Sequence, residues 1–164
     1  MELQGSHHFP VRFDDEVVSD AVRAFVVQRT VRDQKMKWGA AALMVVACLF
    51  LVVQGNFTLA VLAIVVACFP AIFSAIVWRA HSANTFGRYN RMADRRADIT
   101  IDAEGFGISS DLGSGNLTWR NVTEIWERPR SFMLFSGANA FNILPRDTMP
   151  EEVQAFLSAR SVRR

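Results

Sequence analysis

The chain has 164 residues, 51% of them hydrophobic, and a formal net charge of +2. This length has room for one apolar segment and one small domain, and so small a net charge gives no reason to expect a nucleic-acid partner. The charges are unevenly spread: residues 38–78 carry none, residues 79–97 carry five arginines and one aspartate, and residues 98–164 carry seven arginines and nine acids. The excess positive charge therefore directly follows the apolar segment, which is typical of a membrane-proximal collar.

Residues 1–37 are predicted to form a cytoplasmic strand and an amphipathic helix. Apolar and polar residues alternate over Phe9–Phe13, as in a short strand. Asp14, Asp15 and Glu16 then indicate a helix start, because acidic side chains are favoured at the positive end of the helix dipole. We favour this capping role over a catalytic carboxylate pair. The helix is expected to pass through Arg29 and Arg32 directly into the first span. The apolar positions that indicate it have helical spacing: Val18, Ala21, Val22 and Phe25.

Residues 38–78 are predicted to form a transmembrane helical hairpin. Residues 38–53 and 57–78 are almost entirely apolar, and Gln54-Gly55-Asn56 between them favours a tight turn. A membrane-spanning helix needs about 20 apolar residues, with roughly 17 as the lower limit. The second span meets this length, and Lys35 and Lys37 can extend the first by reaching toward the headgroups.

The flanks of this hairpin indicate its orientation. Trp38 and Trp78 stand at its two open ends, where a hairpin brings both to one membrane interface. Basic residues crowd outside both ends and none occurs in the turn, so the positive-inside rule places both termini in the cytoplasm. The first 30 residues have no isolated apolar region of the kind a signal peptide needs. A hairpin buried in a soluble protein is the alternative, but covering it would take more chain than remains.

Small residues recur within the spans. Alanines at every fourth position favour close helix packing in lipid, against the first span or a second copy of the chain: Ala63, Ala67, Ala71 and Ala75. Pro70 predicts a mild kink. The two cysteines, Cys48 and Cys68, should differ in depth by roughly 9 Å. A disulfide needs Cα atoms within about 7 Å, so we expect both to be packing residues.

Residues 79–97 are predicted to continue the second span as a basic helical linker. Arg88, Arg91 and Arg95 would then lie on one helix face. That face either contacts anionic lipid headgroups or packs as a stalk on the N-terminal helix, where Asp20 and Asp33 would pair with it. We slightly favour the lipid contact. The predicted membrane-interface residues are Trp38, Trp78, Arg79, Arg88, Arg91, Arg95 and Arg96.

Residues 98–160 are predicted to form a cytoplasmic antiparallel sheet or partial barrel with a C-terminal helix. Apolar residues alternate from Ile99 onward, and turns are expected at residues 102–105, 111–115 and 137–139. Residues 148–151 have the spacing of a capping box, in which Thr148 would cap the last helix. The residues expected to share one core are Trp119, Phe141, Ile143 and Phe156.

Three stretches of this region resemble the YcxB-like family of small bacterial membrane proteins. They are ITIDAEGF at 99–106, LTWRNVTEIWE at 117–127, and FNILPR at 141–146 followed by EEVQAFL at 151–157. The upstream hairpin fits the same family. The resemblance implies a bacterial plasma-membrane location and a minimal pleckstrin-homology-like (PH-like) C-terminal domain. It implies no activity and no set of catalytic residues.

The expected fold is therefore an α+β membrane protein, in which a transmembrane hairpin with helical extensions carries a small PH-like sheet domain. We expect a non-enzymatic, membrane-anchored binding or regulatory module; the alternative is a structural or oligomerising subunit of a membrane transport complex. The C-terminal domain has no His or Cys, no nucleophile elbow and no phosphate loop, and His7-His8 lacks neighbouring ligands, so we predict neither catalysis nor a metal or other cofactor.

The expected partners follow from this interpretation. They are the lipid bilayer, with anionic lipid headgroups, a protein partner or another copy of the chain as further candidates. A PH-like sheet can take a peptide along an exposed edge or contact headgroups through basic loops. The candidate residues for such a loop are Arg120, Arg128 and Arg130.

Overall fold

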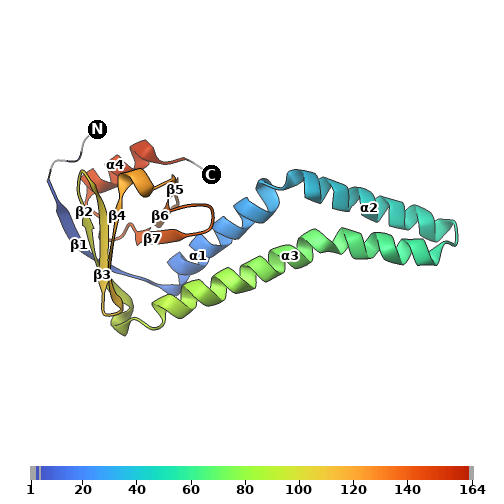
Figure 1. The fold of residues 1–164 in the computed structure, drawn as a ribbon, viewed down its shortest axis with the longest axis horizontal. Helices are drawn as coiled ribbons and strands as arrows, with labels where there is room; N and C mark the ends of the chain where they lie inside the picture. Colours follow the sequence, from blue (N-terminus) through green and yellow to red (C-terminus); the bar gives the residue numbers. More distant parts are fainter. Residues whose placement is uncertain (1–2, 4, 163–164) are drawn as a thin grey trace. The chain divides into compact units, whose positions relative to one another are not determined.

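The computed structural model describes residues 3 and 5–162 and has an α+β architecture. Within these residues there are four α-helices and two small antiparallel sheets (Figure 1). The chain divides into two compact units. The first unit comprises Met1–Ala21 and Asn84–Arg164, and the second comprises Val22–Ala83.

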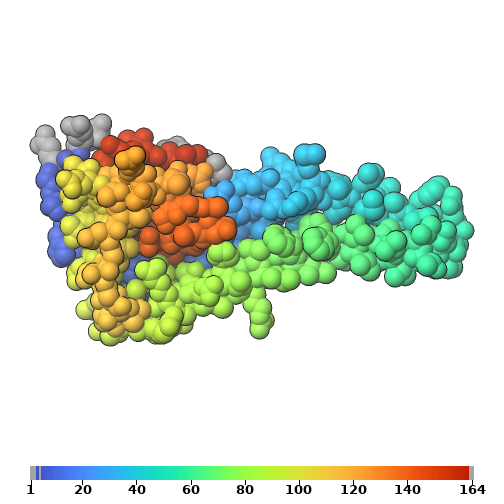
Figure 2. Space-filling view, in the orientation of Figure 1, coloured from blue at the N-terminus to red at the C-terminus, as the bar shows by residue number. Residues whose placement is uncertain are grey.

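The first unit contains a four-stranded sheet in the order β1-β2-β3-β4. Its strands are β1 (His7–Arg12), β2 (Arg96–Ile101), β3 (Gly105–Ser110) and β4 (Gly113–Thr118). Alternation places Ile99 and Ile101 of β2 in the core, as the sequence pattern predicts. At the other edge, β4 is mostly exposed (Figure 2).

The pairing of β1 with β2 joins segments from opposite ends of the helical region. Arg12, the last residue of β1, lies opposite Arg96, the first residue of β2. The Phe13 N–H then donates to the Arg95 carbonyl at 2.9 Å, so the ladder extends one step beyond the strands. The chain therefore leaves the sheet and returns to it at the same end of two neighbouring strands.

The second sheet of this unit contributes a large part of the core. It has the order β5-β6-β7, and the C-terminal helix follows it. The elements are β5 (Glu124–Glu127), β6 (Ser131–Phe135), β7 (Phe141–Pro145) and α4 (Glu151–Arg160). Every residue of the central strand β6 is buried. The Trp126 and Phe135 rings pack with centroids 4.4 Å apart, and α4 buries Val153, Phe156 and Leu157.

Two expectations about this core need correction. Ile143 and Phe156 are buried, but Trp119 is only half-buried. The Trp119 indole packs on Phe156 and donates its Nε1–H to the Asp102 carbonyl at 2.9 Å, which holds it at the rim of the core. Phe141 is likewise half-buried.

The local structure near two predicted loops also differs from the sequence pattern. Gly113–Gly115, expected in a loop, begins β4, because Gly113 pairs with Ser110 across a tighter turn. Thr148 does not cap α4. Its hydroxyl donates to the Pro10 carbonyl of β1 at 2.6 Å, so it ties the start of α4 to the sheet.

The second unit is helical. It continues α1 (Asp15–Val26) through a π-helical segment, η1 (Val27–Arg32), and contains α2 (Lys35–Val53) and most of α3 (Phe57–Tyr89). The predicted turn lies between α2 and α3, with Gly55 at φ +75°. Both helices are long and apolar enough to cross a membrane. The N-terminal helix is thus not continuous with α2, since Asp33 and Gln34 form a turn between them.

The face of α3 that is buried within the second unit does not coincide with the predicted stripe of alanines. Its buried and half-buried positions alternate by three and four residues: Ala60, Ala63, Ala67, Pro70, Ser74 and Val77. Ala71 and Ala75 are exposed within the unit. Four residues advance an α-helix by about 400°, so a stripe repeated every four residues rotates away from a straight contact by about 40° per step.

Candidate functional site

The basic linker contains a sharp connector in place of a continuous helix. α3 ends at Tyr89, and β2 begins at Arg96. Between them Asp94 and Arg95 both have left-handed backbone conformations, with φ of 55° and 50°. L-residues pay about 1–2 kcal/mol for this conformation, and it cannot be part of a right-handed helix. The prediction that Arg88, Arg91 and Arg95 share one helix face is therefore wrong.

Two of these arginines instead stabilise the connector. The Arg95 guanidinium donates to the Asp15 carboxylate at 2.6 Å and to the Asn90 side-chain oxygen at 2.6 Å. Arg91 donates from Nε to the Gly87 carbonyl at 2.9 Å and so satisfies an acceptor near the end of α3. Both side chains hold the segment that joins α3 to the sheet.

Arg88 is the exception among these three. It is exposed, and no hydrogen bond or ion pair joins its guanidinium to any other described residue. It lines a cavity in the first unit. Among the other predicted interface residues, Arg79 and Arg96 are exposed and Trp78 is 39% exposed. Trp38 donates its Nε1–H to the Thr30 carbonyl at 2.8 Å.

Two of the three arginines predicted to bind a partner, Arg128 and Arg130, form ion pairs within the first unit. Arg130 contacts Asp14 at 2.5 Å, Glu16 at 2.7 Å and Asp147 at 3.7 Å. Arg128 donates to both carboxylate oxygens of Asp20, at 3.3 and 3.1 Å. These contacts join the loop before β6 to the first turns of α1.

Asp14 is the centre of this electrostatic arrangement. Its Oδ1 accepts the Val17 N–H at 2.6 Å, which makes it the N-cap of α1 as the acidic run predicts. Partial burial acts to raise the pKa of Asp14, but the hydrogen bonds from Val17 and Arg130 outweigh this and hold that pKa below its ordinary value. The carboxylate is therefore ionised at neutral pH.

Arg120 differs from its two neighbours in the candidate loop. It lies in a short 3₁₀ turn, η3 (Trp119–Asn121), and is exposed. No hydrogen bond or ion pair to it is found within the described residues.

The alternative in which the linker arginines pack as a stalk on the N-terminal helix required Asp20 and Asp33 as their ion-pair partners. In the structure Asp20 pairs with Arg128 and Asp33 pairs with Arg29 at 3.4 Å, so each is paired with an arginine outside the linker.

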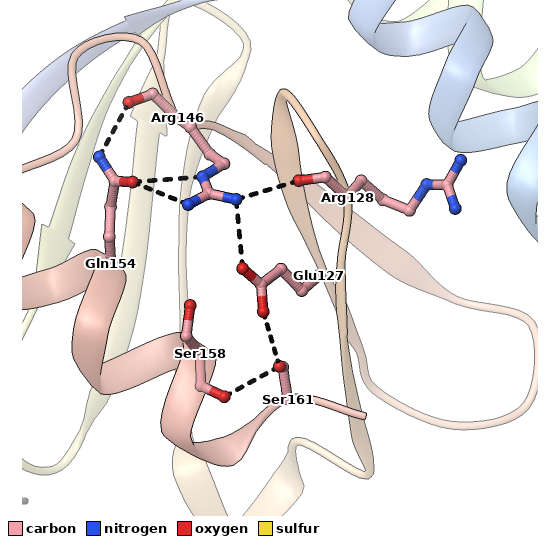
Figure 3. Close-up of polar contacts among 6 residues, drawn as sticks. All are labelled: Glu127, Arg128, Arg146, Gln154, Ser158 and Ser161. Carbon is pink, nitrogen blue, oxygen red and sulfur yellow. Dashed lines mark hydrogen bonds and ion pairs between the residues drawn. The ribbon is translucent and has the colours of Figure 1, made fainter. Parts of the chain in front are cut away.

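Sequence reasoning missed a polar network that surrounds Arg146 (Figure 3). The Arg146 guanidinium donates to the Gln154 side-chain oxygen at 3.2 and 3.1 Å, to Glu127 Oε1 at 3.3 Å and to the Arg128 carbonyl at 3.2 Å. Glu127 Oε2 accepts the Ser161 hydroxyl at 3.2 Å. The network joins β5, α4 and the segment after α4. No local sequence motif marks it, since its members are 34 positions apart at the widest.

The described residues contain no group of three or more His, Cys, Asp or Glu side chains arranged to hold a metal ion. His7 lies in β1 with its Nε2 3.6 Å from Glu152, and His8 Nδ1 lies 3.0 Å from the Thr100 hydroxyl. The two histidines point to different partners, as neighbours in a strand must. The chemical features that the first unit offers are therefore charged side chains, hydrogen-bonding groups and surface cavities, one of which includes Arg88 in its lining.

Comparison with known families agrees with the sequence resemblance. Residues 101–159 match the family model described as YcxB-like protein, which confirms the resemblance for this part of the chain. The match runs from the last residue of β2 into the last turn of α4, so it leaves out β1 and the helices α1 to α3. Neither the curated proteins nor the solved structures gave a significant match.

Proposed function

We propose, for a chain whose residues 101–159 form a YcxB-like domain, that it is a membrane-anchored module that works by binding rather than by catalysis. The apolar hairpin of α2 and α3 would cross the plasma membrane of a bacterium twice. Both chain termini and the sheet domain would lie in the cytoplasm. The module would hold its binding surfaces close to the inner face of the membrane.

The pairing of Arg12 with Arg96 is the observation that carries this proposal. The hairpin is inserted between two hydrogen-bonded strands of one sheet. Both of its connections, through Phe13 and through Arg95, therefore start from the same edge of the domain. Such an insertion suits an anchor, because the domain cannot complete its sheet without both ends of the hairpin on one side of the membrane.

The arrangement of the sheets supports a PH-like fold for the domain. Four strands form one antiparallel sheet, three form another, and α4 packs its apolar face on the core. In this proposal β1 is the first strand of the PH-like domain, so the domain is split by the hairpin. A PH-like scaffold serves to present loops and edges to ligands, and its core needs no catalytic residue.

Topology tests the anchor. An epitope at each end of the chain should be digested by protease in inverted membrane vesicles and protected in vesicles of the native orientation. The chain should also remain with the membrane after alkaline carbonate extraction. Protection of one epitope and digestion of the other would contradict two crossings, and release by carbonate would contradict membrane insertion.

A further inference from the structure

A cavity of about 350 Å³ opens in the first unit beside the β3–β4 hairpin. Residues from the end of α3, from β3 and β4, and from the edge of β7 surround it. Its apolar wall includes Met92, Phe106, Ile108 and Leu117. At its rim Leu112, the residue at the tip of the hairpin, is 50% exposed.

The absence of a side chain at Gly115 leaves part of this space open. Gly115 lies opposite Ile108 in the β3–β4 ladder, and two positions on, Leu117 lies opposite Phe106. Residues opposite each other in an antiparallel pair point to the same face, so a side chain at 115 would point into the cavity. A Cβ atom built there meets no other atom within 4 Å. The strand therefore leaves open a volume that almost any other residue would fill.

The polar lining of the cavity favours an anion. Of the described residues that line it, Arg88 is the only charged one, and none carries a carboxylate. Its other polar groups include Ser114, Ser136 and Asn142, which can donate hydrogen bonds. A guanidinium suits a phosphate because its fork of N–H groups matches the oxygens in geometry and charge.

The position of Arg88 along the chain favours a ligand that comes from the membrane. Ten residues separate it from Trp78 on one continuous helix, α3. On the proposed function, on which this inference rests, Trp78 lies at the membrane interface. The combination of one cation, several hydrogen-bond donors and an apolar wall then fits an amphiphilic anion better than an inorganic ion.

We propose that this cavity binds the phosphate ester of an anionic phospholipid headgroup, with Arg88 as its ion-pair partner. The phosphate lies at the Arg88 end, and the glycerol portion contacts the wall formed by Phe106 and Leu117. Leu112 at the rim faces the same amphiphile. Soluble glycerol phosphate shares the headgroup chemistry, so the test includes it as a second source.

The test uses the full chain in a neutral detergent and measures Kd by isothermal titration calorimetry. The probes are dihexanoyl phosphatidylglycerol, dihexanoyl phosphatidylcholine and glycerol phosphate. Arg88→Gln should weaken phosphatidylglycerol binding about tenfold or more, as expected for the loss of a charge-assisted hydrogen bond. Gly115→Leu should abolish binding by filling the cavity, while the melting temperature stays close to that of the parent chain.

Two variants serve as matched controls. Arg91→Gln removes the same charge three residues away but outside the cavity, and Thr118→Leu places the same leucine side chain at an exposed position of β4 outside the cavity. Both should change Kd by less than about twofold. Equal losses from Arg88→Gln and Arg91→Gln would overturn the proposal in favour of general charge attraction. Should Gly115→Leu fail to fold, Arg88→Gln still decides, because that side chain is exposed and unpaired among the described residues.

The ligands distinguish the source. Binding of phosphatidylglycerol without glycerol phosphate supports a lipid, and Arg88-dependent binding of both supports the headgroup as the recognised part. Phosphatidylcholine binding equal to that of phosphatidylglycerol, or no binding of either anion, would overturn the proposal. These titrations in detergent do not depend on how the chain crosses the membrane. The proposal of a membrane anchor and the proposal of a lipid-binding cavity can therefore be refuted independently.

Discussion

The aromatic rings of Phe13 and Tyr89 pack with centroids 4.3 Å apart. Phe13 follows β1 where the chain leaves the sheet, and Tyr89 is the last residue of α3 where the chain returns. Both side chains are buried. This pair closes the end of the sheet at which both connections to the hairpin lie.

Phe13→Ala should destabilise the first unit. Removing a buried phenylalanine ring typically lowers the free energy of unfolding by about 3–5 kcal/mol, which is a large part of the stability of a small domain. Limited proteolysis of the full chain should show faster cleavage within residues 84–164. Phe13→Leu, which keeps most of the apolar volume, is the control, and cleavage as slow as in the parent for Phe13→Ala would refute the packing argument.

Acid should weaken the Asp14 cluster over a defined range. The folded-state pKa of Asp14 lies below its ordinary value of 3.8. Stability from this group is therefore fully present above about pH 4 and is lost as the pH falls through the folded-state pKa. Asp14→Asn should be less stable at neutral pH and should show a smaller loss of melting temperature as the pH falls below about 4. An unchanged acid dependence would exclude this role.

Trp126 and Trp119 should respond differently to truncation. Trp126 is 1% exposed and packs on Phe135, so Trp126→Ala should lower the free energy of unfolding by about 3–5 kcal/mol. Trp119 is half-buried at the rim, and Trp119→Ala should have a smaller effect. Denaturant midpoints of the two variants compare them directly. A larger effect at Trp119 would mean that the rim, and not β5, forms the main core.

Loss of Arg146 should leave partly buried polar groups unsatisfied. Arg146→Ala removes the donor that Glu127 and Gln154 share, and the expected loss is about 1–3 kcal/mol. Glu127→Gln in the same background should restore part of it, because it removes the charge left without its partner. A double-mutant cycle of chemical denaturation measures the coupling. Strict additivity of the two changes would show that the network is not coupled.

Elements with strong local patterns could be predicted from the sequence. The apolar helices, the turn at Gly55, the β2–β3 hairpin and the apolar face of the last helix all depend on neighbours in the chain. The partnership of β1 with β2 could not, since nothing near Phe9 specifies a strand so far along the chain. Nor could the connector, because an aspartate tolerates the left-handed conformation better than most residues but an arginine does not, and nothing in the local sequence places both Asp94 and Arg95 in it.

The candidate site was likewise predicted only in part from the sequence. The sequence predicted a basic region after the second apolar helix. The direction of each side chain, which the sequence does not give, decides which groups each arginine contacts. The end of α3 at Tyr89 separates Arg88 from Arg91 and Arg95, and no sequence period contains that break. Likewise the N-terminal acids that bind Arg128 and Arg130, which are Asp14, Glu16 and Asp20, are more than 100 residues away from them in the chain.

The split sheet also sets the order of events during synthesis. His8 and Thr100, partners across β1 and β2, lie 92 residues apart. At about 5–20 residues per second, the ribosome needs ~5–20 s to make β2 after β1 has emerged. The hairpin is made in between, so under the proposed anchoring its helices would enter the bilayer while β1 is still unpaired. Insertion of both helices would then bring the two halves of the sheet close together, and β1 would find its partner faster than in a free chain.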